Sequence, residues 1–140
     1  MASPTDAPPA RPAVVPDARS QPFFDACARG VLVIKRCRRC STWNAPAAAL
    51  CWSCVGEDLD WAEVSGRATL HTFGVVHQVS HPGFREEVPY NIAVVELAEG
   101  PRMNSNIVDC EAGALVVGMA LEVRFVELPN GVTIPKFAPA

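Results

Sequence analysis

The sequence predicts a mainly β protein with an N-terminal helix, a four-cysteine zinc ribbon and a five-stranded β-barrel. Three observations lead to this prediction: a short helical pattern, two closely spaced Cys-x-x-Cys pairs, and a series of apolar runs separated by turn signals. The chain has 140 residues and 49% hydrophobic side chains, which suits one domain with a small appendage. We expect an arm at residues 1–19, a helix at 20–30, the ribbon at 31–62 and the barrel at 63–140.

The first two segments differ sharply in composition. Residues 1–19 contain five prolines and five alanines and almost nothing to bury, which predicts a flexible arm. A helix follows, because Ser20 can cap it, Pro22 suits its first turn and Gly30 suits its end. Three apolar side chains fall on one face of this helix: Phe23, Phe24 and Cys27. We expect this face to pack on the zinc ribbon, and docking on another subunit is the alternative.

The two cysteine pairs predict a metal site. The four ligands are Cys37, Cys40, Cys51 and Cys54. Each pair can present two thiolates from one turn, and two facing turns form the tetrahedral four-sulfur cage that Zn²⁺ prefers. A four-sulfur iron site stays open, because iron accepts the same ligands. A redox pair is disfavoured because no βαβ unit is visible, and disulfides would need an oxidising compartment.

The segments around the cysteines read as short strands. Residues 31–34 form a β-branched run that leads into Cys37, while Leu59 and Trp61 fit a closing strand. In a ribbon of this kind the metal holds strands that have too small a core of their own. Four cations surround the first turn: Lys35, Arg36, Arg38 and Arg39. They can balance the net −2 charge of a zinc tetrathiolate or attract phosphates, and their spacing does not separate the two roles.

The second half of the chain predicts a small closed barrel of the OB type. Five strands are expected, at residues 68–79, 90–97, 103–108, 121–126 and 132–137. Asn130-Gly131 is a strong hairpin signal between the last two. The 79–90 loop is long enough for recognition, and an ordinary exposed loop is the alternative. His77 and His81 lie on a predicted strand and turn, where their spacing does not place both imidazole rings on one metal ion.

Composition limits the classes of function and compartment. The net charge of −3 argues against a freestanding nucleic-acid binder. The N-terminus lacks the apolar run that a secretory signal requires. The longest apolar stretch, residues 113–123, is too short to span a bilayer. Six cysteines in such a chain fit a reducing cytoplasm, so we expect a cytoplasmic protein without membrane contact. Cys27 and Cys110 are expected to be buried free thiols.

Several stretches together resemble one known family, the zinc-ribbon (rubredoxin-like) plus OB-fold acyl-CoA-associated proteins, first catalogued as a domain of unknown function. The stretches that carry the resemblance are residues 22–24, 30–32, the two cysteine pairs, 61–67, 75–77, 81–84, 88–90, 95–101, 106–108 and 131–135. The resemblance covers residues 20–140. Ser41 and Ala68 depart from the family, which usually has glycine after the second cysteine and often has glycine after Ser-Gly-Arg.

The resemblance implies an accessory subunit. Members of this family form complexes with thiolases or thiolase-like aldolases of the sterol-carrier type, share the acyl-CoA with them, and support their activity in pathways such as steroid side-chain or aromatic-acid degradation. The catalytic residues would then lie on the partner, and we expect this chain to be non-catalytic on its own. By analogy we expect two copies per partner dimer.

Acyl-CoA would require cations for its phosphates. The candidates near the ribbon and the long loop are Arg36, Arg38, Arg39 and Arg85. A competing interpretation is a single-stranded nucleic-acid binder, in which bases stack on aromatic side chains of the barrel. The aromatic residues available for this are Phe73, Phe84, Tyr90, Phe125 and Phe137. A self-sufficient hydrolase is the least supported alternative, because no Ser-His-Asp or metal-water signature is visible.

Overall fold

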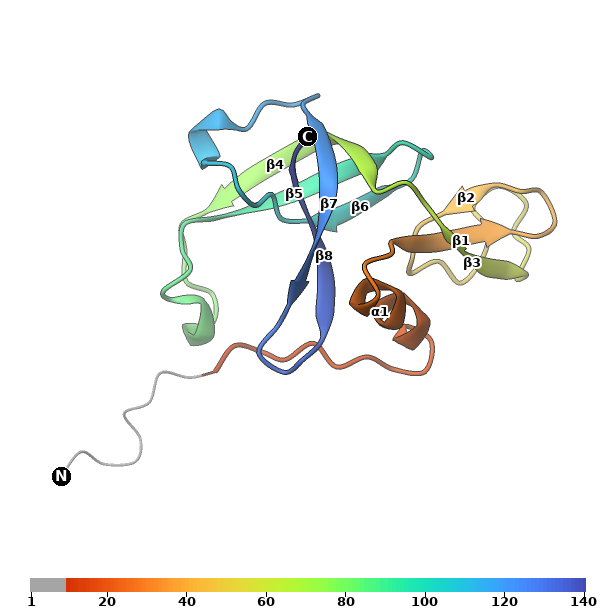
Figure 1. The fold of residues 1–140 in the computed structure, drawn as a ribbon, viewed down its shortest axis with the longest axis horizontal. Helices are drawn as coiled ribbons and strands as arrows, with labels where there is room; N and C mark the ends of the chain where they lie inside the picture. The colour runs from red at the N-terminus through yellow and green to blue at the C-terminus, as the bar shows by residue number, and fades with distance from the viewer. Residues whose placement is uncertain (1–9) are drawn as a thin grey trace.

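Two β-sheets and one helix make up the part of the chain that the computed structural model describes, residues 10–140. The small sheet has the order β2-β1-β3, and the large sheet has the order β6-β5-β4-β7-β8. Figure 1 shows the small sheet beside the large one, with α1 next to both. No helix among the described residues is long and apolar enough to cross a bilayer. The predicted mainly β architecture is confirmed.

Helix α1 spans Gln21–Ala28 and ends as predicted. Gly30 has φ +74°, and the N–H groups of Gly30 and Val31 donate to the carbonyls of Cys27 and Ala26, a Schellman ending. The start differs from the prediction, because the Ser20 hydroxyl does not cap the helix. It hydrogen bonds to Asp17 Oδ1 at 2.6 Å, and the turn that precedes the helix therefore begins at Asp17.

The ribbon sheet consists of β1 (Val33–Cys37), β2 (Trp43–Asn44) and β3 (Leu59–Glu63), all antiparallel. The predicted closing strand is confirmed. The first strand starts two residues later than predicted, because the N–H of Val31 is bonded to the helix end. Leu32 still contributes to the junction, since its carbonyl accepts the N–H of Val64 at 3.0 Å.

The large sheet is antiparallel throughout. Its strands are β4 (Arg67–Val76), β5 (Tyr90–Leu97), β6 (Arg102–Ser105), β7 (Ala120–Glu127) and β8 (Thr133–Pro139). The sheet curls, and its two edges meet at a parallel bridge between Ile107 and Phe137. This strand order and this closure agree with the predicted OB fold. Two short 3-10 helices lie in its loops, at Pro82–Phe84 and Ala112–Ala114.

The barrel closure explains one error in the predicted strand boundaries. The third strand was expected to run to residue 108, but β6 ends at Ser105. Residues 106–108 leave the backbone ladder with β5 and pair with β8: Phe137 N–H donates to Asn106 O at 3.1 Å, and Val108 N–H donates to Phe137 O at 2.8 Å. Asn91 of β5 still bonds to this segment, since its Nδ2 donates to Ile107 O at 2.8 Å and its Oδ1 accepts the N–H of Ile107 at 2.7 Å. The first strand is also shorter than predicted, since β4 ends at Val76 and the 77–89 loop follows.

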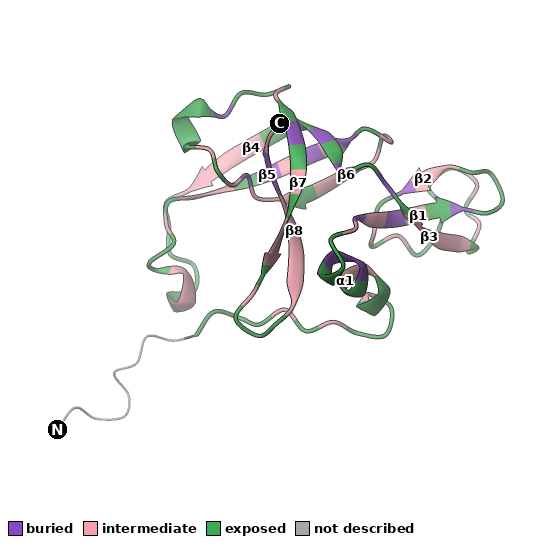
Figure 2. Cartoon of the chain, in the orientation of Figure 1, coloured by how far each residue is buried: buried purple, intermediate pink, exposed green. Residues whose placement is uncertain are grey.

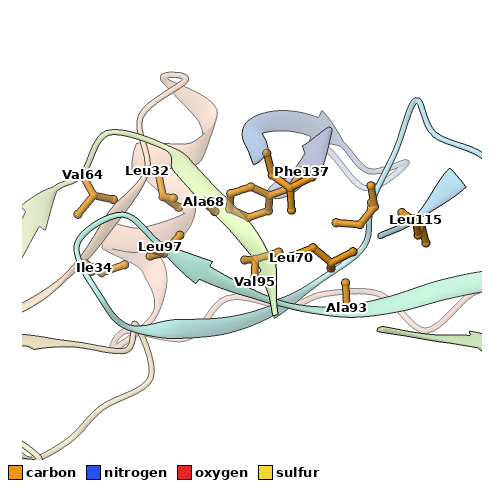
Figure 3. Packing of buried hydrophobic residues seen from close by; sticks show 12 residues of the cluster. Leu32, Ile34, Val64, Ala68, Leu70, Ala93, Val95, Leu97, Leu115 and Phe137 are labelled. Carbon is orange, nitrogen blue, oxygen red and sulfur yellow. The ribbon is translucent and has the colours of Figure 1, made fainter. Parts of the chain in front are cut away.

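One core extends from the barrel into the base of the ribbon. Its buried residues are Leu32, Ile34, Val64, Ala68, Leu70, Ala93, Val95, Leu97, Ile107, Leu115, Leu121 and Phe137. Figure 2 shows buried positions along β4, β5 and the start of β1, with the outer ribbon loops largely exposed. In Figure 3 the Phe137 ring lies in the middle of this cluster, with Ile34 at one end and Leu115 at the other.

The helix packs differently from the prediction. Its face was expected to cover the zinc ribbon, but α1 packs on β8 and β7 of the barrel as well as on β1. The ribbon contact is made by Phe23, whose ring lies 6.1 Å from that of Trp61. Cys27 is buried, as expected, and burial raises the pKa of its thiol to about 11. Cys110 is only half-buried, so the prediction of a buried thiol is wrong there.

The described part of the predicted arm has no regular secondary structure at residues 10–17. It is nevertheless held against the barrel. Arg11 forms an ion pair with Glu87 at 2.8 Å, and Asn130 Nδ2 donates to Val14 O at 2.9 Å. The arm prediction for residues 1–9 lies outside the described residues.

Candidate metal centre

The four predicted cysteine ligands come together at the outer end of the ribbon. Cys37 Sγ lies 3.6 Å from Cys54 Sγ, and Cys40 Sγ lies 3.6 Å from Cys51 Sγ. All four sulfurs lie within 4.8 Å of one another. Zn–S bonds of about 2.3 Å in a tetrahedron place sulfurs about 3.8 Å apart, so the cluster has the size of a tetrathiolate site. No other group of three or more possible ligands occurs among residues 10–140.

The two cysteine turns have matching backbone geometry. Ser41 N–H donates to Cys37 O, and Val55 N–H donates to Cys51 O, each at 2.9 Å. Ser41 and Val55 both have φ +61°, the left-handed region in which glycine is favoured. This geometry explains why glycine suits the position that Ser41 occupies. Serine at this position changes the local backbone strain and leaves the four sulfurs in place.

Local hydrogen bonds favour thiolates at two of the ligands. The backbone N–H of Cys54 is the main cause that lowers the pKa of Cys51 to about 6, and the Asn44 side chain adds to it. A hydrogen bond between Cys40 Sγ and Thr42 Oγ1, at 3.1 Å, lowers the pKa of Cys40. Metals bind the deprotonated thiolate, so these bonds favour the ligand form of Cys40 and Cys51. Burial and the neighbouring cysteine sulfurs act in the opposite direction on Cys54 and raise its pKa to about 11.

Asn44 is a supporting residue that sequence reasoning missed. It is the only buried polar side chain among the described residues, and it links both cysteine turns. Its Nδ2 donates to Thr42 O at 2.9 Å and approaches Cys51 Sγ at 3.6 Å, while its Oδ1 accepts the N–H of Trp52 at 3.0 Å. An asparagine between two Cys-x-x-Cys pairs, next to an apolar residue, was the available signal.

We expect Asn44→Ala to lower the affinity for Zn²⁺ by about 10- to 100-fold, because groups that orient metal ligands typically contribute this much. Competition with a chromophoric chelator measures the affinity. Asn104→Ala, at an exposed position of β6, is the matched control and should leave the affinity unchanged. An Asn44→Ala protein that binds Zn²⁺ as tightly as the original would contradict this role.

The predicted phosphate-binding arginines fall into two places. Arg36, Arg38 and Arg39 are exposed on the ribbon, whereas Arg85 is exposed in the 77–89 loop. In Figure 1 this loop, drawn in green, lies at the opposite end of the barrel from the ribbon. The structure therefore brings the three ribbon arginines together and does not bring Arg85 to them.

The ribbon arginines also differ in whether they already have ion-pair or hydrogen-bond partners. Arg38 is paired with Asp60 and lies 3.7 Å from Asp58. The Arg36 guanidinium lies 4.8 Å from the centre of the Trp43 ring, and its Nε donates to Ser41 O at 3.1 Å. Among the described residues Arg39 has no ion pair within 4.0 Å, so it is the ribbon arginine most available to an external anion.

A groove runs between α1, the ribbon loop and the barrel. It has a volume of about 540 Å³. Its apolar lining includes Phe23, Phe24, Pro46, Met103 and Ile134. Apolar grooves of this size with a few polar groups are typical of small-molecule sites.

The histidines do not form a second site. His81 Nδ1 accepts the N–H of Gly83 at 3.0 Å and so caps the 3-10 helix at Pro82–Phe84. His77 is exposed at the end of β4.

Comparisons with known proteins decide the family. Residues 61–134 match the family model described as "ChsH2, C-terminal OB-fold domain". A DUF35 domain-containing scaffold protein of Methanocaldococcus jannaschii is 35% identical over 98 residues, which are 69% of this chain and 69% of that protein. The chain belongs to the DUF35 family.

Solved and curated relatives of this DUF35 chain include parts of larger assemblies. A chain of the structure titled "Ltp2-ChsH2(DUF35) aldolase" superposes with a TM-score of 0.78 at 32% identity, covering 92% of this chain and 98% of that one. A probable enoyl-CoA hydratase alpha subunit of Thermomonospora curvata is 35% identical over 84% of this chain. This DUF35 chain spans only 36% of the length of that subunit.

The ribbon of this DUF35 chain also exposes apolar side chains beside the metal cage. Trp52 is 75% exposed, Val55 68% and Leu50 46%. All three lie next to Cys51 or Cys54 in the sequence, so the metal would hold them in a fixed arrangement. A rigid cluster of exposed apolar residues is typical of a protein-binding surface.

Proposed function

We propose that this DUF35 chain is an accessory subunit that assembles with a thiolase-like aldolase or a hydratase-type enzyme subunit and helps it bind an acyl-CoA. The likeness to the DUF35 chain of the aldolase structure carries this proposal, because it extends over nearly the whole of that chain. Catalytic residues would belong to the partner. The role of this chain would be to present a metal-stabilised docking surface and part of the ligand site.

The exposed cluster of Leu50, Trp52 and Val55 supports the docking role. Tryptophan is enriched among residues that dominate interface energies, and Trp52 is already oriented by a hydrogen bond from its Nε1 to Trp43 O at 3.0 Å. A pre-oriented side chain loses less conformational freedom on binding. We infer that this cluster contacts the partner.

The partner prediction can be tested by expressing this chain together with a thiolase-like aldolase from the same organism. We expect the two to elute together in size-exclusion chromatography, and Trp52→Ser to weaken the complex by about 2 kcal/mol or more. Val116→Ser, at a position that is 62% exposed far from the ribbon in the sequence, is the control. Separate elution of the two wild-type proteins at micromolar concentration would reject the proposal.

The groove between α1, the ribbon loop and the barrel supports a contribution to acyl-CoA binding. Its aromatic and aliphatic lining suits an acyl or pantetheine chain. The ribbon arginines could contact the phosphates, and Arg39 and Arg36 are better placed to do so than Arg38, which is held by two carboxylates. Zinc would have a structural role here, because all four of its positions would be filled by cysteine.

We expect Arg36→Ala and Arg39→Ala to raise the dissociation constant of the complex for acyl-CoA several-fold each, because each removes a charge-assisted contact to phosphate. Arg85→Ala lies at the far end of the barrel and serves as the matched comparison. Isothermal titration of the assembled complex with acyl-CoA measures the constants. An effect of Arg85→Ala alone would move the phosphate site to the 77–89 loop.

The nucleic-acid alternative receives no support from the barrel surface. Of its five aromatic side chains Phe137 is buried, and the other four are half-buried. The Phe84 ring is covered by the Arg11 guanidinium, 5.0 Å from its centre. Single-strand binders need open aromatic faces along a basic groove.

A further inference from the structure

The arm segment, residues 10–14, lies across two loops of the barrel. One is the 77–89 loop with its 3-10 helix at Pro82–Phe84, and the other is the turn between β7 and β8. In Figure 1 the arm segment, in red to orange, passes below the 77–89 loop and crosses the β7–β8 turn. In OB folds the loops between the first and second strands and between the fourth and fifth strands commonly bind ligands. These are the two loops that the arm segment covers.

The 77–89 loop holds one arginine side chain on its surface. Arg11 Nη1 lies 2.8 Å from Glu87 Oε1, and the Arg11 guanidinium lies 5.0 Å from the centre of the Phe84 ring. Phe84 is itself positioned by Tyr90 and His81, whose rings lie 6.0 and 6.1 Å away. A carboxylate at the edge and an aromatic face together select arginine over an uncharged side chain.

Gly83 allows the arm backbone to approach the loop. A Cβ atom at this position would lie 2.8 Å from Ala10 O and 2.8 Å from Arg11 Cα. The three nearest atoms are all arm atoms, and the backbone at Gly83 does not have a left-handed φ. A side chain here would therefore collide first with the arm.

The β7–β8 turn holds the other end of the arm segment but leaves space beneath it. Asn130 Nδ2 donates to Val14 O at 2.9 Å. A cavity of about 360 Å³ remains between the arm segment and the residues Leu128, Pro129, Asn130 and Ile134. The small Ala13 side chain does not fill it, so a bulkier apolar side chain could be accommodated there.

We propose that the surface between the 77–89 loop and the β7–β8 turn is a binding site for an extended peptide with an arginine followed by proline and apolar residues. Residues 10–14 of this chain are its occupant. Glu87 and Phe84 bind the arginine side chain, Gly83 and Asn130 contact the peptide backbone, and the cavity below Ala13 accommodates the apolar part. The arm thereby covers the recognition loops of the barrel, and they become accessible only when it is displaced.

The test uses the full-length, metal-loaded protein and backbone ¹⁵N order parameters. We expect values of about 0.8 for Arg11, Ala13 and Val14 in the original chain, and values below about 0.6 in Gly83→Ala. Arg124→Ala removes an arginine from an exposed ion pair with Glu122 on β7 and should leave the arm rigid. Unchanged resonances of the barrel core would show that Gly83→Ala folds normally.

A second measurement asks whether the site accepts a peptide from outside. Arg11→Ala weakens the occupant and leaves the site intact, so a synthetic peptide of residues 10–16 should bind this variant with saturable shifts at Gly83, Glu87 and Asn130. The same peptide with alanine in place of arginine should bind about tenfold more weakly, and the Arg11→Ala, Gly83→Ala double variant should not bind.

Two results would overturn the proposal. One is an arm that is already mobile in the original chain and does not respond to Gly83→Ala. The other is equal binding of the arginine and alanine peptides, which would show apolar adhesion without recognition.

Discussion

Removal of the metal with a strong chelator is expected to unfold residues 35–61 while the barrel stays folded. The outer ribbon has almost no core of its own: beyond Leu32 and Ile34, which belong to the barrel core, its buried residues are Cys37, Asn44 and Cys51. Structural zinc sites contribute roughly 10–16 kcal/mol of binding free energy, far more than this small sheet could replace. We also expect the proposed enzyme partner to be released, because the exposed apolar cluster would lose its fixed arrangement.

The chain provides a selective probe for this experiment. All three of its tryptophans, Trp43, Trp52 and Trp61, lie in the ribbon, and its single tyrosine, Tyr90, lies in the barrel. Tryptophan emission should shift to the red on chelation, while the amide resonances of β4, β5 and β8 should persist. Cys51→Ser should reproduce the effect, and Cys110→Ser, which removes a thiol outside the cage, should not. Unchanged tryptophan emission in protein that metal analysis shows to be metal-free would contradict the structural role.

Phe137→Ala is expected to lower the free energy of unfolding by about 3–5 kcal/mol. The Phe137 side chain has 0% exposure and lies in the middle of the core, and its backbone forms both hydrogen bonds that close the barrel. Truncation removes a large buried surface and leaves a cavity between strands that cannot easily move together. A domain of this size has a total stability of about 5–15 kcal/mol, so the variant would be close to unfolding.

Urea unfolding of the metal-loaded protein, followed by far-ultraviolet circular dichroism, measures this loss. Ile92→Ala is the control, because Ile92 is 53% exposed on β5 and its truncation should change the stability by about 0.5 kcal/mol. A loss below about 1 kcal/mol for Phe137→Ala would mean that the core does not depend on this ring.

Local patterns were sufficient for most of the secondary structure. The strand at residues 90–97 was predicted with its observed boundaries, and the helix stop signal at Gly30 was identified correctly, because each depends on neighbours in the sequence. The error at residues 106–108 has the opposite origin. Their apolar character suggested a continued strand, but their partner is Phe137, about thirty residues away, and no local signal identifies it.

Part of the candidate metal site was also predicted from the sequence. Cysteine spacing was enough to predict that the four cysteines come together, since each Cys-x-x-Cys pair can present two thiolates from one tight turn. Asn44 was missed because its three hydrogen-bonding partners come from both turns. Arg85 was grouped with the ribbon arginines because a sequence does not record which loops lie at which end of a barrel.

The sequence alone therefore determined which four cysteines come together, the order of helix, ribbon and barrel, and most strand positions, since these follow from short-range spacing and alternation. Only the tertiary structure decided that α1 packs mainly on the barrel, that residues 10–14 cover the 77–89 loop, and that the ribbon and barrel share one core. These features depend on contacts between residues far apart in the chain, where burial of apolar surface and the geometry of closure select the partners.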